Sequence, residues 1–118
     1  MFVAFTAIEK LWDKSQKILF LGSWCLTNKS SKIKNDFEIL EYHWSDLKKV
    51  ENDNIYLFKL YQTAMPLLSK KLNEIHNVSY SNRYWEILVG VWYVKFIEVI
   101  FDRYSTLINL RKRTKEEK

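Results

Sequence analysis

Residues 18–25 read Ile-Leu-Phe-Leu-Gly-Ser-Trp-Cys, so four consecutive apolar residues run into one of only two glycines in the chain. The apolar run predicts a strand over 17–21 that is covered on both faces, as central strands of parallel sheets are. Gly22 ends that strand. The pattern therefore predicts an α/β domain. The loop after the strand is either a ligand site at the sheet edge or a tight turn that packs into the core.

Two further segments predict strands beside this one. Residues 2–6 are β-branched and aromatic at the start, and in residues 37–42 Phe37, Ile39 and Glu41 alternate with Glu38 and Leu40. The fold class expected is a small, parallel, Rossmann-like sheet of about three strands. In that class the sheet is joined to helices, and here the helices follow it in the sequence.

After His43 and Trp44 the periodicity becomes helical. Ser45 and Asp46 suit the start of a first long helix, and Pro66 predicts a kink, or two helices that meet, near residues 64–65. Residues 77–82 read as a polar loop. A second long helix is expected from Arg83 to about Asn109, followed by a basic polar tail over 111–118.

The second helix is apolar around most of its circumference. Its polar residues fall in a stripe roughly 80° wide, at about 100° per residue. A chain of 118 residues cannot easily surround such a helix. We expect residues 84–101 to be covered by further chain, by a second subunit or by a membrane surface. The stripe consists of Lys95, Glu98, Asp102, Ser105 and Asn109.

Composition narrows the function classes. The formal charge is +5, of which residues 111–118 supply +3, so the basic excess is largely a property of the tail and no nucleic-acid partner is predicted. A single cysteine excludes an internal disulfide and suits a reducing compartment. The apolar run 87–101 is interrupted by Lys95 and Glu98, so no membrane span is expected. We expect a cytoplasmic protein, with the inner face of the membrane as an alternative.

The strand ends supply the candidate site. Gly22 allows a bound group to approach the backbone, and Ser23 offers a hydroxyl; Trp24 and Cys25 belong to the same loop. His43 follows the third expected strand, so it lies on the same carboxyl edge and is the candidate catalytic acid or base. The alternative for each is structural: a packed turn for residues 22–25, and a half-buried cap of the next helix for His43.

Arg83 is the sixth candidate. It follows Ser81 and Asn82 at a helix start, where free amides and a guanidinium suit an anion; simple capping by Ser81 or Asn82 is the alternative. Glycine-rich phosphate loops, nucleophile elbows and paired-cysteine metal spacings do not occur in the sequence. Neither a cofactor nor a metal site is predicted.

Several segments together resemble one bacterial family. These are FLGSWCL at 20–26, YHWSDLKK at 42–49, the run from Leu72 to Ile97 and IFDRY at 100–104. They are similar to the amino-terminal region of transferases encoded among surface-polysaccharide and O-antigen genes. The later part of that family looks like glycosyl- and glycerophosphotransferases with two Rossmann-like domains. Residues that match recurring positions are Gly22, Trp24, Cys25, His43, Trp44, His76, Arg83 and Trp85.

The resemblance implies that residues 1–110 are the amino-terminal part of a Rossmann-like domain on the acceptor side. A nucleotide-sugar donor site would then lie in further chain or in another subunit, and the acceptor would be a polysaccharide or a lipid-linked sugar. The family tends to have an acidic residue where Ser23 stands and a proline where Val91 stands. The first departure puts an acid–base role for the loop in doubt.

Three hypotheses follow. The first is an acceptor-side transferase part, incomplete as a half-domain and inactive alone, with its cleft along residues 22–25 and His43. The second is a non-enzymatic module that dimerises or docks through helix 84–101. The third is a peripheral membrane protein whose aromatic side chains and Arg111–Arg113 meet anionic lipid.

Overall fold

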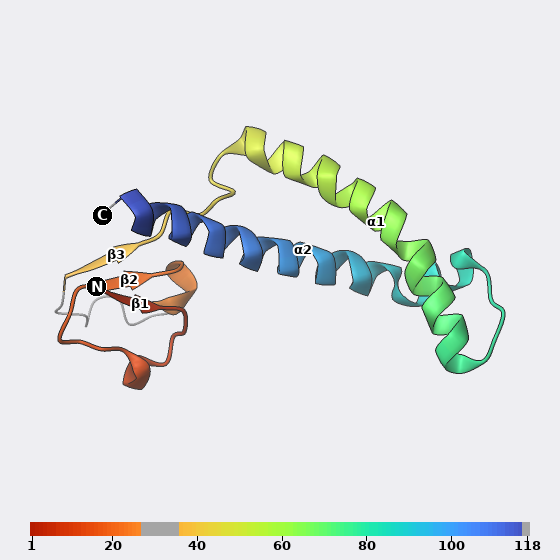
Figure 1. The fold of residues 1–118 in the computed structure, drawn as a ribbon, viewed down its shortest axis with the longest axis horizontal. Helices are drawn as coiled ribbons and strands as arrows, with labels where there is room; N and C mark the ends of the chain where they lie inside the picture. The colour runs from red at the N-terminus through yellow and green to blue at the C-terminus, as the bar shows by residue number, and fades with distance from the viewer. Residues whose placement is uncertain (27–35, 117–118) are drawn as a thin grey trace. The chain divides into compact units, whose positions relative to one another are not determined.

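The structure, a computed structural model, describes residues 1–26 and 36–116. In these residues the chain forms a parallel sheet and two long helices, as Figure 1 shows, and the predicted α/β class is confirmed. Two short 3-10 helices, η1 and η2, lie between the strands. The elements are β1 (Phe2–Ala4), η1 (Glu9–Leu11), β2 (Ile18–Phe20), η2 (Ser23–Cys25), β3 (Phe37–Ile39), α1 (Leu47–His76) and α2 (Asn82–Glu116).

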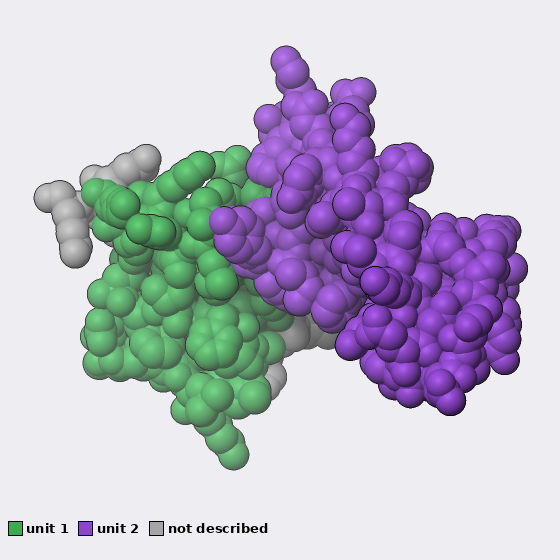
Figure 2. Space-filling view, turned by 45° about the vertical axis from the view of Figure 1, so that its right-hand side comes forward, with its two compact units in different colours: residues 1–45, 106–118 green, residues 46–105 purple. Residues whose placement is uncertain are grey.

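The chain divides into two compact units, which Figure 2 shows in different colours. Unit 1 comprises Met1–Ser45 and Thr106–Lys118, and unit 2 comprises Asp46–Ser105. Unit 1 therefore holds the sheet and the last turns of α2. Unit 2 holds α1 and the greater part of α2.

The sheet of unit 1 has the order β1-β2-β3, with both pairs parallel. All three residues of β2 are fully buried, which confirms that the apolar run seen in the sequence is the central strand. Each strand has three residues and is shorter than the sequence predicted. The ladder nevertheless continues one residue further, because the Leu21 amide donates to the Ala4 carbonyl and the Leu40 amide donates to the Phe20 carbonyl.

Alternation along β2 divides the apolar side chains of unit 1 between the two faces of the sheet. On one face Ile18 and Phe20 pack with Trp12 and Cys25. On the other face Leu19 and Leu21 pack with Leu40, and Leu110 of α2 covers them in part. The far end of the chain is thus part of the core around the first strands.

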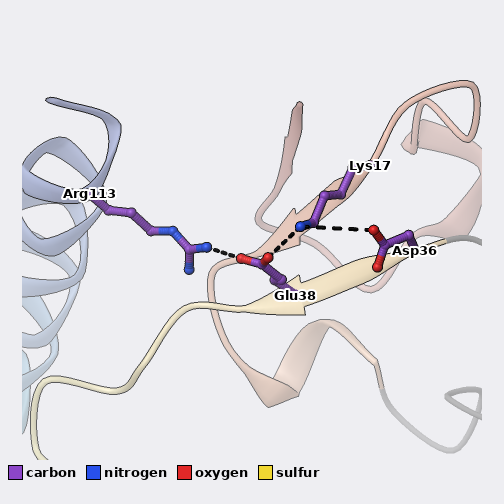
Figure 3. Close-up of polar contacts among 4 residues, drawn as sticks. All are labelled: Lys17, Asp36, Glu38 and Arg113. Atoms are coloured by element: carbon purple, nitrogen blue, oxygen red, sulfur yellow. Dashed lines mark hydrogen bonds and ion pairs between the residues drawn. The ribbon is translucent and has the colours of Figure 1, made fainter. Parts of the chain in front are cut away.

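An ion-pair network also ties α2 to the sheet (Figure 3). The Glu38 carboxylate of β3 accepts from Arg113 of α2 and from Lys17, whose ammonium also lies 3.9 Å from Asp36. The helix that the sequence predicted to end near Asn109 continues to Glu116. No glycine or proline interrupts residues 91–118, and Arg113 gains a carboxylate partner by staying helical.

α1 is one helix that contains Pro66. Proline has no N–H to donate and its ring crowds the preceding turn, which bends a helix without necessarily ending it. The ribbon of α1 in Figure 1 changes direction in its green half. The helix begins at the Asp46 cap, whose carboxylate accepts from the Lys48 amide at 2.9 Å.

The turn between α1 and α2 is fixed by one carboxamide. Asn73 Oδ1 accepts from the Tyr80 amide at 3.1 Å and from Trp85 Nε1 at 2.8 Å, and its Nδ2 donates to the Tyr80 carbonyl at 2.8 Å. Asn77 ends α1 in the left-handed conformation, and the Val78 amide closes the turn on the Asn73 carbonyl. These bonds join the loop to both helices of unit 2.

Within unit 2, α1 contacts α2 through side chains on a row of residues spaced by four. On α1 the covered row contains Leu57, Tyr61, Met65 and Ser69, and on α2 it contains the position of Gly90. The Tyr61 hydroxyl lies so close to Gly90 that a Cβ there would sit 2.9 Å from it.

Candidate functional site

The carboxyl edge of the sheet is the first candidate region. Ala4 pairs with Phe20 and Phe20 with Ile39, so the three parallel strands end together. Segments that leave this edge are the ones that contact ligands in open parallel sheets. The loop at Gly22 leaves β2 here, and the segment toward His43 leaves β3. The predicted site residues of unit 1 thus come from neighbouring strands.

Gly22 is needed for space and not for backbone conformation. Its φ of 178° is extended backbone that any residue adopts. A Cβ at Gly22 would overlap the six-membered ring of Trp24, because the indole folds back over the glycine. Ser23 and Trp24 are exposed at the start of η2, and the Gly22 carbonyl accepts from the Cys25 amide at 3.1 Å. The loop therefore presents a hydroxyl and an indole at the sheet edge.

Cys25 faces the interior. The residue is 0% exposed, and its Sγ lies 3.6 Å from the Ala4 carbonyl, toward which the thiol donates. It belongs to the apolar cluster around Phe20. The structure thus gives Cys25 the role of anchoring the loop to β1.

His43 is buried, with 6% of its surface exposed. Its imidazole forms a cluster of three rings with its chain neighbours, with ring centroids 4.9 Å from Tyr42 and 4.7 Å from Trp44. The Ser45 amide donates to the Tyr42 carbonyl, so these residues form a turn just before α1. The structure therefore places the acid or base candidate of the sequence in the segment between β3 and α1.

Arg83 belongs to unit 2, and the other five predicted site residues belong to unit 1. Its guanidinium is largely exposed and lies 3.5 Å from the Glu86 carboxylate. The Ser81 hydroxyl accepts from the Tyr84 amide at 3.1 Å, as an N-cap does, which favours the capping alternative for Ser81. The Asn82 carboxamide accepts from Ser69 and donates to Glu86.

Sequence reasoning missed a groove between the helices of unit 2. Its volume is about 500 Å³, and it is lined mainly by apolar side chains of α1 and α2. Gly90 was the available signal, because a glycine within a strongly apolar helix often marks a close approach of another element. The lining comprises Asn54, Leu57, Phe58, Tyr61, Arg83, Glu86, Gly90, Val91, Val94, Ile97 and Glu98.

Comparison with known proteins identifies the family of the chain. The sequence profile of the family described as "LIC12162 family transferase" matches residues 1–118. The chain belongs to the LIC12162 transferase family. The resemblance to a transferase family found in the sequence is confirmed at that level. No curated protein and no solved structure matches the chain.

A LIC12162 family transferase moves a chemical group between two molecules, so it needs places for a donor and an acceptor. Within the described residues of this family member, we find no cluster of three or more His, Cys, Asp or Glu side chains that could hold a metal ion. The same residues contain no helix with the length and apolar character needed to cross a bilayer. Polar and aromatic groups gather at the sheet edge of unit 1, and in unit 2 they gather around the turn between α1 and α2.

Proposed function

We propose that this LIC12162 family transferase provides the acceptor side of a glycosyl- or related transfer reaction in the synthesis of bacterial surface polysaccharide. The acceptor is a polysaccharide or lipid-linked sugar, bound along the carboxyl edge of the sheet. The observation that carries the proposal is the common edge at which the Gly22–Ser23 loop and the His43 segment leave neighbouring parallel strands.

The residues at this edge have matching roles in the proposal. The Trp24 indole packs on the apolar face of a sugar ring, and the Ser23 hydroxyl hydrogen-bonds a sugar hydroxyl. His43 accepts the proton of the attacking acceptor hydroxyl. The acceptor oxygen then forms a bond to the anomeric carbon, while the bond from that carbon to the nucleoside diphosphate breaks and the diphosphate leaves with the electron pair.

The donor site is proposed to lie in another part of a longer protein or in a partner subunit, within an enzyme of two Rossmann-like domains. A diphosphate needs a cradle of backbone amides, which Rossmann-like folds form with a glycine-rich loop. The chain contains only two glycines, Gly22 and Gly90, and they are far apart in sequence. The chain alone is therefore proposed to bind acceptor without transferring sugar.

Titration of the purified chain tests this proposal. O-antigen repeat-unit oligosaccharides and nucleotide sugars are added separately, and binding is followed through the indole and imidazole NMR signals. We expect the oligosaccharides to shift the Trp24 and His43 signals, and Trp24→Ala to weaken binding roughly tenfold. Trp92→Ala is the matched control, because that indole is exposed in unit 2.

Two outcomes contradict the proposal. Equal oligosaccharide affinity in Trp24→Ala and wild type removes the acceptor site from the sheet edge. Transfer of sugar from a nucleotide donor by the 118-residue chain alone shows that the donor site is already present.

A further inference from the structure

An open recess lies at the turn between α1 and α2, in the part of unit 2 where Figure 1 shows the two helices joined. Its volume is about 560 Å³, which is within the range of roughly 300–1,000 Å³ that is typical of small-molecule sites. Residues 77–82, which the sequence predicted to be a polar loop, supply part of the lining. The recess is lined by three carboxamides and three hydroxyl groups, those of Asn73, Asn77, Asn82, Ser69, Ser79 and Tyr80.

This polar lining narrows the class of ligand that the recess suits. Small-molecule sites are usually lined mainly by apolar side chains, with a few polar groups that fix the orientation of the ligand. Carboxamides and hydroxyl groups each donate and accept hydrogen bonds, so this lining suits a ligand that carries several hydroxyl groups. Sugars are ligands of that kind.

Two of the carboxamides are held in fixed orientations. Asn73 bonds the backbone of Tyr80, as described above. Asn82 accepts from the Ser69 hydroxyl at 2.7 Å and donates to the Glu86 carboxylate at 2.9 Å. Each of these two amide nitrogens has two hydrogens and uses one of them in bonds to the described residues. A ligand that accepts the second hydrogen meets a group that is already oriented, so binding needs to order little of the protein.

The third carboxamide and one of the hydroxyl groups are open to a ligand. Within residues 1–26 and 36–116, the side chains of Asn77 and Ser79 form no hydrogen bond with another residue. Both residues are exposed at the recess, so water satisfies their polar groups in the free protein. The hydroxyl groups of a sugar can replace that water and keep the number of hydrogen bonds unchanged.

Tyr80 supplies a flat ring beside these polar groups. The Asn73 carboxamide bonds both its backbone amide and its carbonyl, and its ring centroid lies 4.2 Å from that of Tyr84. The residue nevertheless remains 47% exposed. A pyranose ring has a face that carries mainly C–H groups and packs on an aromatic ring, while the hydroxyl groups at its rim bond to planar amides. The recess offers both kinds of contact.

The charges that line the recess favour a neutral ligand. Lys70 and Glu74 contribute one charge of each sign, so no excess of positive charge selects a phosphate group. The Lys71 ammonium donates to the Glu74 carboxylate at 2.9 Å, and this hydrogen bond lowers the pKa of Glu74. Glu74 is therefore ionised at neutral pH, where it accepts hydrogen bonds from hydroxyl groups and repels an anion.

We propose that this recess binds a neutral sugar, with one pyranose ring packed on Tyr80. The hydroxyl groups of that ring bond to Asn77 and Ser79, and to the carboxylate of Glu74. Because the recess is open, the expected Kd for a short oligosaccharide is about 1 mM. The proposal does not rest on the proposed function, since all of the lining residues belong to unit 2 and the acceptor edge belongs to unit 1.

NMR titration of the 118-residue chain with maltotriose and with chitotriose tests the proposal. We expect at least one of them to shift the side-chain amide signal of Asn77 and the ring signals of Tyr80. Sorbitol is the matched control ligand, because it carries hydroxyl groups but has no ring face to pack on Tyr80. It is expected to bind roughly tenfold more weakly. The proposal is overturned if neither trisaccharide shifts these signals, or if sorbitol shifts them equally.

Substitutions at Tyr80 test the stacking contact. Tyr80→Ala is expected to weaken sugar binding roughly tenfold, whereas Tyr80→Phe keeps the ring and most of the affinity. Both variants keep the bonds to Asn73, because these use backbone atoms of Tyr80. Tyr104→Ala is the matched control, since Tyr104 is a 62% exposed tyrosine of unit 2 that does not line the recess. Equal affinity in Tyr80→Ala and wild type overturns the proposal.

Asn77→Gly tests the open carboxamide without disturbing the end of α1. Asn77 has a φ of 51°, and glycine adopts this left-handed conformation without strain. The variant should keep the helical circular dichroism of wild type and bind the sugar about threefold to tenfold more weakly. An unchanged affinity removes Asn77 from the contact and overturns the proposed geometry.

Two further readings separate this proposal from its alternatives. Inorganic phosphate that shifts the Asn77 signal, where neither trisaccharide does, overturns the sugar site in favour of an anion site at Lys70. The Trp24 and His43 signals report the acceptor edge in the same spectra. Shifts at Tyr80 with unmoved Trp24 and His43 support the recess and count against the proposed function. Shifts at Trp24 and His43 with an unmoved Tyr80 overturn the recess and leave the proposed function standing.

Discussion

Gly22 and Gly90 show how differently one missing methyl group can act. At Gly22 an added Cβ overlaps the ring of Trp24, and at Gly90 it meets the end of the Tyr61 side chain. Gly90 lies inside α2, where alanine is favoured over glycine by about 1 kcal/mol. Gly22 precedes η2 and lies outside any α-helix, so a substitution by alanine there gains no helix propensity to offset the overlap.

We predict that Gly22→Ala keeps the fold, displaces the Trp24 ring and lowers the free energy of unfolding by about 1–2 kcal/mol. Trp24 is partly exposed and can swing outward, which limits the loss. Gly90→Ala is expected to change stability by less than about 0.5 kcal/mol, because helix propensity offsets the contact with Tyr61. Urea unfolding measures both values, and the indole NMR signals report the ring. An unmoved Trp24 signal in Gly22→Ala contradicts the prediction.

At the scale of elements, the order of apolar and polar residues predicted the features that depend mainly on neighbouring residues in the sequence. The run from Ile18 to Leu21 is apolar at every position, which only a strand covered on both faces accommodates, and β2 is that strand. Gly22 and His43 could be placed at one sheet edge because the ends of parallel strands coincide. The inward direction of Cys25 was one of two alternatives that the sequence left open, and Gly90 signals a close approach but not the shape of the groove, because both features depend on packing between distant segments.

The hairpin of α1 and α2 rests on Asn73, and this yields a prediction. Asn73→Ala removes three hydrogen bonds to Tyr80 and Trp85, so we expect the free energy of unfolding to fall by about 2–3 kcal/mol. Asn73→Asp keeps an acceptor for Trp85 but cannot donate to the Tyr80 carbonyl, and its loss is expected to be smaller. Urea unfolding followed by circular dichroism gives the order. An equal loss in both variants would show that the acceptor atom contributes little.

At the scale of the whole molecule, the ends of the chain meet in unit 1. The Arg113–Glu38 pair joins residues 75 positions apart, and Leu110 covers the cluster of Leu19, Leu21 and Leu40. Contacts of such sequence separation form slowly, because a long loop must close before they contribute. The strands near the amino terminus therefore reach full stability only when the end of α2 is in place.

Two substitutions test whether the apolar contact of Leu110 or the ion pair of Arg113 contributes more to holding the end of α2 on the sheet. Leu110→Ala removes apolar cover from the sheet, and because Leu110 is half-buried we expect a loss of about 1–2 kcal/mol. Arg113→Gln breaks an ion pair whose side chains are about one third exposed, and such pairs contribute at most about 1 kcal/mol. Native-state hydrogen exchange should then show faster exchange of the β2 and β3 amides in Leu110→Ala than in Arg113→Gln, with the α1 amides of unit 2 unchanged in both. If Arg113→Gln speeds exchange in the sheet more than Leu110→Ala does, the ion pair and not the apolar contact closes unit 1. The physical reason would be that, without Arg113, Glu38 shares the positive charge of Lys17 with Asp36.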